Sequence, residues 1–234
     1  MPSPTPSQKV SQVSMFGGKN ITIKIVGDIY DDSYEASLVY SKKHKKTFIH
    51  PFDDEDVIIG QGTMALEILN QSFFPIDYLL VPIGGGGLIS GMINVFKQKS
   101  PKTRIIGIEP KGAPSMYESM RQNKRITLDR IDNFVDGAAV KTIGKISFDY
   151  CSKFLDDIVI VDEGEICQNI LTMYNNDAII VEPAGAMSIT GLNKMSKSIK
   201  NKNVVCLICG GNNDITRMSE IKERALLFNN LKHY

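Results

Sequence analysis

Short apolar runs alternate with longer amphipathic stretches along most of the chain. The apolar runs predict strands and the amphipathic stretches predict helices, so we expect an α/β fold with a mostly parallel sheet covered on both faces, in three layers. The runs DYLLV and NVVCLI are almost continuously apolar, which is typical of strands buried on both sides. Strands are predicted at 21–27, 47–50, 77–83, 104–110, 156–164 and 203–211, and helices at 31–46, 55–71, 165–175 and 182–195.

Two glycine clusters follow predicted strands. In DYLLVPIGGGGLISG, four glycines at Gly84–Gly87 separate a strand-like run from a helix-like run. Free N–H groups at the positive end of a helix dipole suit a phosphate. Gly210 and Gly211 end the last predicted strand. Because ligands of open α/β sheets bind at the carboxyl ends of the strands, we expect both clusters to line one crevice.

Other interpretations of the first cluster remain open. Gly85, Gly87 and Gly91 form a G-x-G-x-x-x-G pattern, and Glu109 follows Gly87 by 22 residues. That spacing is close to a dinucleotide fingerprint, so a nicotinamide-dependent oxidoreductase is an alternative. A tight strand–helix turn without a ligand is another.

The composition excludes some classes of function. The chain has 234 residues, 42% of them hydrophobic, and a net charge of +1, which is typical of a globular protein and gives no electrostatic reason to expect nucleic acid or membrane partners. No signal-peptide pattern or long apolar run is present, so we expect a cytoplasmic protein. Cys206 and Cys209 form a CxxC, but positions three apart in a strand face opposite sides, so we expect no metal site there.

Six motifs in order resemble one known family: HPFDDEDVIIGQGTMALEIL, VPIGGGGLISG, RIIGIEPKGAPSMYESM, FVDGAAV, VEPAGA and CGGNND. Together they resemble the threonine dehydratase family of fold-type II pyridoxal-phosphate enzymes, which includes serine racemase and serine dehydratase. The resemblance implies a fold like that of the tryptophan synthase β subunit, with an incomplete smaller domain at 1–50 and a large, cofactor-holding domain at 51–234. The tail ERALLFNNLKHY resembles the linker to the regulatory domain of the biosynthetic threonine deaminases of isoleucine biosynthesis.

The resemblance also assigns roles to residues. It implies a lyase that binds pyridoxal phosphate and converts L-threonine to 2-oxobutanoate and ammonia by β-elimination, with L-serine as a second substrate. Cys209 would face the pyridine nitrogen, and a weak thiol partner would leave that nitrogen unprotonated, which favours prompt elimination. The cysteine resembles serine dehydratases, so a serine dehydratase or racemase remains an alternative, as does a purely structural cysteine. The residues implied to hold the phosphate are Gly84, Gly85, Gly86, Gly87 and the amide of Leu88.

Four further positions have weaker interpretations. Glu182 either orients a substrate or a catalytic water, or caps the helix that it precedes. Asp136 lies in a turn expected beside the cofactor ring. Glu109 matches a divalent-cation position of some relatives, but the partner carboxylate corresponds to Ser115 here, so we expect no metal. His50 is expected at a packed strand end.

The family's catalytic lysine forms a Schiff base within an S-F-K-x-R-G-A type motif, and this motif does not occur in the sequence. The resemblance therefore implies a fragment cut at both ends, without a catalytic lysine and without dehydratase activity unless a complementing chain is present. Lys19, Lys24 and Lys141 have no motif support as substitutes. A catalytically inactive anion-binding scaffold is a further alternative. The family also implies a homo-oligomer with a small amino acid as substrate.

Overall fold

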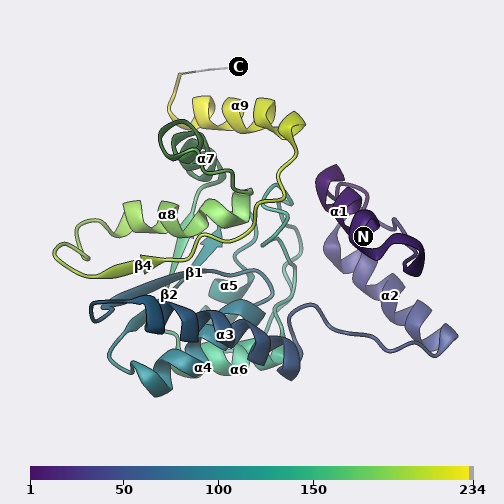
Figure 1. The fold of residues 1–234 in the computed structure, drawn as a ribbon, viewed down its shortest axis with the longest axis horizontal. Coiled ribbons are helices and arrows are strands. Elements are labelled where there is room, and N and C mark those ends of the chain that lie inside the picture. Colours follow the sequence, from purple (N-terminus) through teal and green to yellow (C-terminus); the bar gives the residue numbers. More distant parts are fainter. Residues whose placement is uncertain (232–234) are drawn as a thin grey trace.

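A parallel sheet forms the centre of the computed structural model, which describes residues 1–231 (Figure 1). In the order β3-β2-β1-β4, every neighbouring pair of strands is parallel. Leu80 in the middle of β1 is in register with Ile106 on one side and Cys206 on the other. The strands are β1 (Tyr78–Pro82), β2 (Arg104–Pro110), β3 (Asp157–Val161) and β4 (Val204–Cys206).

Helices cover both faces of this sheet, which confirms the three-layer α/β prediction (Figure 1). Side chains alternate along a strand, so Leu79 and Val81 pack into one apolar cluster and Leu80 into the other. The first cluster is covered by α3 (Glu55–Gln71), α4 (Gly87–Lys99), α5 (Ser115–Arg121) and α6 (Lys145–Phe154), and the second by α7 (Glu163–Asp177), α8 (Pro183–Met195) and α9 (Met218–Phe228).

The first 50 residues lie beside the sheet and add no strand to it (Figure 1). They form α1 (Ser7–Gly17), η1 (Gly18–Asn20) and α2 (Tyr30–His44). The strand predictions at 21–27 and 47–50 are wrong, because these segments lack a neighbouring strand to complete a ladder. The proposed domain boundary near residue 50 stays a prediction.

The strand predicted at 203–211 is shorter in the structure and ends at Cys206. After a last bond from the Leu207 N–H to the Leu80 carbonyl (3.0 Å), the chain turns at Gly210 (φ 94°) toward the start of α8. The short η2 (Ile215–Arg217) and α9 then complete the described chain, and the last three residues of ERALLFNNLKHY lie outside it. None of the helices within residues 1–231 is long and apolar enough to cross a membrane.

Candidate functional site

A cavity of about 340 Å³ opens where β1 and β4 end, at the carboxyl edge of the sheet. Gly84–Leu88 line one part of its wall, and Cys209 and Gly210 line another. Asp136 and Glu182 complete the polar part of the wall. The structure therefore brings both glycine clusters to one cavity, as the sequence predicts, and its volume suits a small-molecule ligand.

The backbone of the tetraglycine loop leaves its donors unused. Among the hydrogen bonds of residues 1–231, none is donated by the N–H of any residue from Gly84 to Leu88. The carbonyls, in contrast, are engaged: that of Gly86 accepts from the Ser90 N–H (3.0 Å) and that of Gly85 accepts from the Gly144 N–H (3.0 Å). Unbonded N–H groups at the N-terminus of α4 are the donor set that a phosphate dianion requires.

Close packing against Phe52 explains why the loop consists of glycine. A Cβ on Gly85 would lie 2.3 Å from Cγ of Phe52, and a Cβ on Gly87 would lie 2.6 Å from its carbonyl oxygen. Gly86 adopts φ 96°, a left-handed conformation that side chains disfavour. The glycines thus let the loop pack against its neighbours while its N–H groups stay free.

The HPFDD motif holds Phe52 in this position. Nδ1 of His50 accepts hydrogen bonds from the N–H groups of Phe52 (3.3 Å) and Asp53 (2.9 Å), and burial lowers the pKa of His50. The Asp53 carboxylate accepts from the N–H groups of Lys145 (2.8 Å) and Ile146 (2.9 Å), which caps α6. His50 does not end a strand, contrary to the prediction, but it fixes the turn that carries Phe52.

Cys206 and Cys209 lie on opposite sides of the sheet, which confirms their predicted separation. Cys206 packs into the cluster under α7 and α8, whereas Cys209 packs into the cluster under α3 and α4. Burial and the neighbouring charge of Glu182 raise the pKa of the half-buried Cys209 thiol, so it stays neutral at physiological pH. The described chain contains no group of three or more His, Cys, Asp or Glu side chains placed to hold a metal ion.

Glu109 is fully buried and lies away from the cavity. Its carboxylate accepts from the N–H groups of Met116 (2.8 Å) and Tyr117 (2.7 Å), and burial raises its pKa to about 8. An enclosed side chain is not available to a ribose hydroxyl. This position contradicts the dinucleotide interpretation, which requires Glu109 at the ligand.

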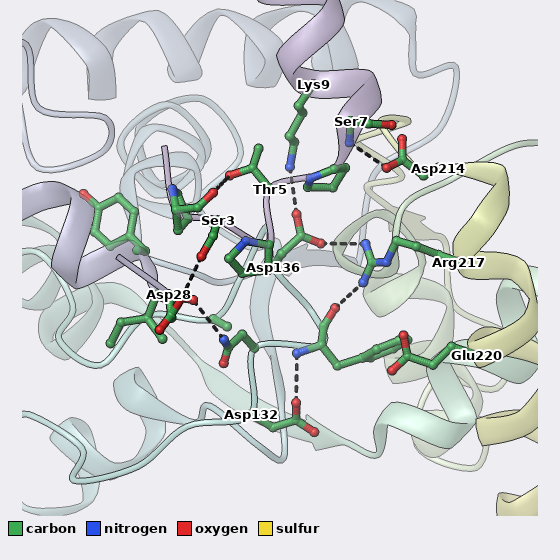
Figure 2. Close-up of a pocket in the computed structure, with 18 of the residues that line it drawn as sticks. Ser3, Thr5, Ser7, Lys9, Asp28, Asp132, Asp136, Asp214, Arg217 and Glu220 are labelled. Carbon is green, nitrogen blue, oxygen red and sulfur yellow. Dashed lines mark hydrogen bonds and ion pairs between the residues drawn. The ribbon is translucent and has the colours of Figure 1, made fainter. Parts of the chain in front are cut away.

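Asp136 lines this cavity and also a neighbouring cavity of about 1040 Å³, where it belongs to a charged cluster that was not expected from the sequence (Figure 2). Asp136 pairs with Lys9 (3.1 Å) and with Arg217 (2.9 Å). Glu182 lies 3.8 Å from the Lys9 amine and accepts from the Asn212 N–H (3.2 Å), while burial raises its pKa. The Glu182 side chain does not cap α8, which removes one of its two predicted roles.

A glycine loop with unbonded N–H groups at the carboxyl edge of a parallel sheet is typical of α/β proteins that bind a phosphate-bearing small molecule. Comparison with known families agrees with this class. The chain belongs to the pyridoxal-phosphate dependent enzyme family, whose pattern it matches over residues 1–210. The biosynthetic L-threonine dehydratase IlvA of Halalkalibacterium halodurans is 54% identical over 234 residues, and that of Bacillus subtilis is 50% identical. Both alignments cover 100% of this chain and 56% of the relative, so the chain spans little more than half the length of these relatives.

Solved structures place the fold among the fold-type II enzymes, as predicted. The processed form of threonine deaminase isoform 2 from Solanum lycopersicum superposes with a TM-score of 0.87 at 37% identity, covering 96% of this chain and 65% of that one. Serine racemase from Dictyostelium discoideum superposes with a TM-score of 0.77 at 29% identity, covering 92% of this chain and 68% of that one.

Pyridoxal phosphate is the cofactor of this family, and the cavity has the chemistry to accept it. The unbonded N–H groups of Gly84–Leu88 match the charge of a phosphate, and the positive end of α4 adds to that match. The neutral thiol of Cys209 lies in the same cavity wall. Asp136 and Glu182 are the carboxyl side chains of this wall, and the charge of Asp136 is paired with Lys9 and Arg217.

Proposed function

We propose that the protein is a pyridoxal-phosphate-dependent ammonia-lyase that converts L-threonine to 2-oxobutanoate and ammonia, with L-serine as a second substrate. One observation carries the proposal: a loop with five consecutive unbonded backbone N–H groups lines a cavity that it shares with Cys209 and Glu182. The names and similarity of the threonine dehydratases support threonine as the substrate.

In this mechanism Gly84–Leu88 would hold the cofactor phosphate through their N–H groups, and Cys209, in the wall of the same cavity, would face the pyridine nitrogen. Bound pyridoxal phosphate supplies an electron-withdrawing ring that stabilises negative charge developing at the substrate's α-carbon. Cys209 keeps its proton on Sγ because burial raises the thiol pKa. A neutral thiol favours prompt loss of the β-hydroxyl over racemisation.

Glu182 and Asp136 are the charged groups available to orient a substrate in the cavity. The Glu182 carboxyl is free of a capping role and has a pKa raised by burial, so it can hold a proton or position a water. The Phe52 ring packs against the loop at Gly85 and closes the binding site on that side.

We also propose that these 234 residues do not deaminate threonine by themselves, because the lysine motif of the family does not occur in them. A direct test mixes the chain with a separately expressed segment of the Halalkalibacterium halodurans enzyme that carries the lysine motif. We expect 2-oxobutanoate only from the mixture, and less pyruvate from L-serine than 2-oxobutanoate from L-threonine. Threonine turnover by the unmixed chain at the rate of the intact relative would refute this part.

Cofactor binding is tested separately, with pyridoxine 5′-phosphate, which has no aldehyde, and with pyridoxine, which has no phosphate. Calorimetry should detect binding only of the phosphate ester, and inorganic phosphate should compete with it. If binding occurs but the mixture remains inactive, the chain is an anion-binding scaffold. If the phosphate ester does not bind, the proposed site is wrong.

We further propose that the chain forms a homo-oligomer. Phe73 and Phe74, in the loop between α3 and β1, are 95% and 70% exposed, and adjacent exposed aromatic rings are typical of buried contacts between subunits. Sedimentation of the wild type against the Phe73→Ser/Phe74→Ser variant tests this, and a monomeric wild type would contradict it.

A further inference from the structure

The segment from Ile21 to Val26 is extended, and the first residues of the chain bond to one of its two edges. The Met1 amine donates to the Lys24 carbonyl (2.8 Å), and the Met1 carbonyl accepts from the Val26 N–H (2.9 Å). Bonds from one residue to two positions that lie two apart are the pattern of a parallel ladder. Lys24 and Val26 therefore direct these backbone groups toward the edge that Met1 covers.

The opposite edge of the segment has no partner. Successive residues of an extended chain direct their backbone groups to alternate edges, so Ile21, Ile23 and Ile25 face away from Met1. Within residues 1–231, no hydrogen bond is made by the N–H or the carbonyl of Ile23 and Ile25, or by the carbonyl of Ile21. An open edge of this kind is a template for pairing with another strand.

Apolar side chains beside this edge lack cover within the described chain. The helices before and after the segment, α1 and α2, contain no buried residue. Ile21 and Ile25 are exposed, and so is Phe16 (81%), which directly precedes Gly17. A Cβ on Gly17 would lie 2.3 Å from Cγ2 of Ile21, so the end of α1 packs at the start of the segment. Exposed apolar side chains next to an unpaired edge indicate an interaction surface.

A lysine on an open edge commonly prevents pairing, and Lys24 is the charged residue of this segment. Its amine, however, lies 4.0 Å from the centroid of the Tyr40 ring in α2. This cation–π contact holds the charge against α2. Lys24 therefore does not protect the free edge formed by the isoleucines.

We propose that a second copy of the chain occupies this edge, so that residues 21–25 of two copies pair as antiparallel strands with Ile23 at the twofold axis. In this register Ile23 exchanges both of its backbone bonds with Ile23 of the second copy, and Ile21 exchanges its bonds with Ile25. The free groups of the edge then all have partners. This contact adds to the proposed homo-oligomer and is separate from the loop of Phe73 and Phe74.

The side chains favour this register over its neighbours. Isoleucine lies opposite isoleucine at each bonded position, and Lys24 lies opposite Thr22. An axis at Lys24 would place two lysines opposite each other and would use a carbonyl that already bonds to Met1. Because the first 50 residues lie beside the sheet, a second copy reaches them without displacing any of its strands (Figure 1). Pairing of the same patch on both copies closes at two.

The primary measurement uses the unmodified chain, labelled with nitrogen-15, and compares amide hydrogen exchange in dilute and concentrated samples. We expect exchange to slow with concentration at Ile23 and Ile25 but not at Thr22 and Lys24, because only alternate amides enter the new ladder. Sedimentation equilibrium of the same samples should show association over the same range of concentration. Burial of the segment by any other contact would slow all four amides.

Two proline variants separate edge pairing from a general loss of structure. Ile23→Pro removes an N–H that bonds nothing within the described chain, and it should weaken dimerisation at least about tenfold because the bonds at the axis are lost. Thr22→Pro is the matched control, since its N–H faces the other edge, and it should change the dimerisation constant by less than about twofold. Both are measured in the Phe73→Ser/Phe74→Ser background, which removes the other proposed contact.

Four results would overturn the proposal. Equal slowing of all four amides would show burial without edge pairing. Loss of all association in the Phe73→Ser/Phe74→Ser background, or equal association of the Ile23→Pro and Thr22→Pro variants, would remove the edge contact and leave that of Phe73 and Phe74 standing. A wild type that stays monomeric would remove both contacts. If the separately expressed Halalkalibacterium halodurans segment slows Ile23 and Ile25 and concentration does not, the edge belongs to that segment and not to a second copy.

Discussion

The contact between Phe52 and Gly85 predicts a stability penalty for any side chain at position 85. A Cβ there would lie 2.3 Å from Cγ and 2.4 Å from each Cδ of Phe52, at the inner end of the ring. That end of the ring moves least when the side chain rotates, so the loop itself must shift. Overpacking of this kind costs about 1–3 kcal/mol, and we expect Gly85→Ala to lower the free energy of unfolding by about 2 kcal/mol.

A double-mutant cycle with Phe52→Ala tests the cause of the penalty. Without the ring, Gly85→Ala should cost less than about 0.5 kcal/mol, because the two changes are coupled through one contact. Gly60→Ala is the matched control: Gly60 lies exposed in α3 with nothing within 4 Å of an added Cβ. In a helix interior this change should stabilise the protein by about 0.5–1 kcal/mol.

Urea unfolding followed by circular dichroism gives these free energies, provided that the m-value is unchanged. Calorimetry with pyridoxine 5′-phosphate measures whether the shifted loop still binds a phosphate, and we expect Gly85→Ala to bind more weakly than Gly60→Ala. The reasoning would be refuted if Gly85→Ala lowered the free energy of unfolding equally with and without the Phe52 ring. It would also be refuted if Gly85→Ala changed neither the stability of the protein nor its affinity for pyridoxine 5′-phosphate.

Three further predictions follow from single side chains. Asp53→Ala removes the cap of α6 and should lower the free energy of unfolding in urea by about 1 kcal/mol, whereas Asp149→Ala, which removes an exposed ion pair, should change it by less than about 0.5 kcal/mol. Burial raises the pKa of Glu109 to about 8, so the folded state retains a proton that the unfolded chain has lost. The free energy of unfolding should therefore fall as the pH rises from about 5 to 8, and Glu109→Gln should remove this decrease; a pH-independent wild type would contradict the assignment. Pyridoxine 5′-phosphate should slow alkylation of Cys209, which lines the cavity, but not of Cys206, and equal protection of both thiols would argue against the site.

The elements that the sequence predicts well are those whose pattern is local. The apolar run 104–110 matches the bounds of β2, and the amphipathic stretch 55–71 matches those of α3. The segment at 21–27 alternates like a strand, but a strand forms only with a neighbour. In the structure this segment has only isolated bonds, such as Val26 N–H to the Met1 carbonyl (2.9 Å) and the Ser33 hydroxyl to the Val26 carbonyl (2.6 Å), and Ile25 is 51% exposed.

The residues of the candidate site also fall into those that a local pattern predicts and those that only tertiary packing brings together. The sequence locates the tetraglycine loop and Cys209, because each is marked by residue types that follow a strand. It does not locate the charged cluster around Asp136, because Lys9, Asp136 and Arg217 come from segments far apart in the chain. Single positions of common charged residues carry no pattern, and their proximity is determined only by tertiary packing.

The shape of the phosphate cradle depends on a closed ring of contacts and not on the glycines alone. Phe52 packs on Gly85, and the next residue, Asp53, accepts hydrogen bonds from the first turn of α6. Gly144, directly before that turn, donates its N–H to the Gly85 carbonyl (3.0 Å) and closes the ring. The HPFDD motif therefore acts on the proposed phosphate site through packing, because its contacts restrain the loop whose N–H groups are unbonded. A change at Asp53 should weaken phosphate binding although Asp53 is outside the cavity wall, which distinguishes a loop held by its neighbours from one that is rigid by itself.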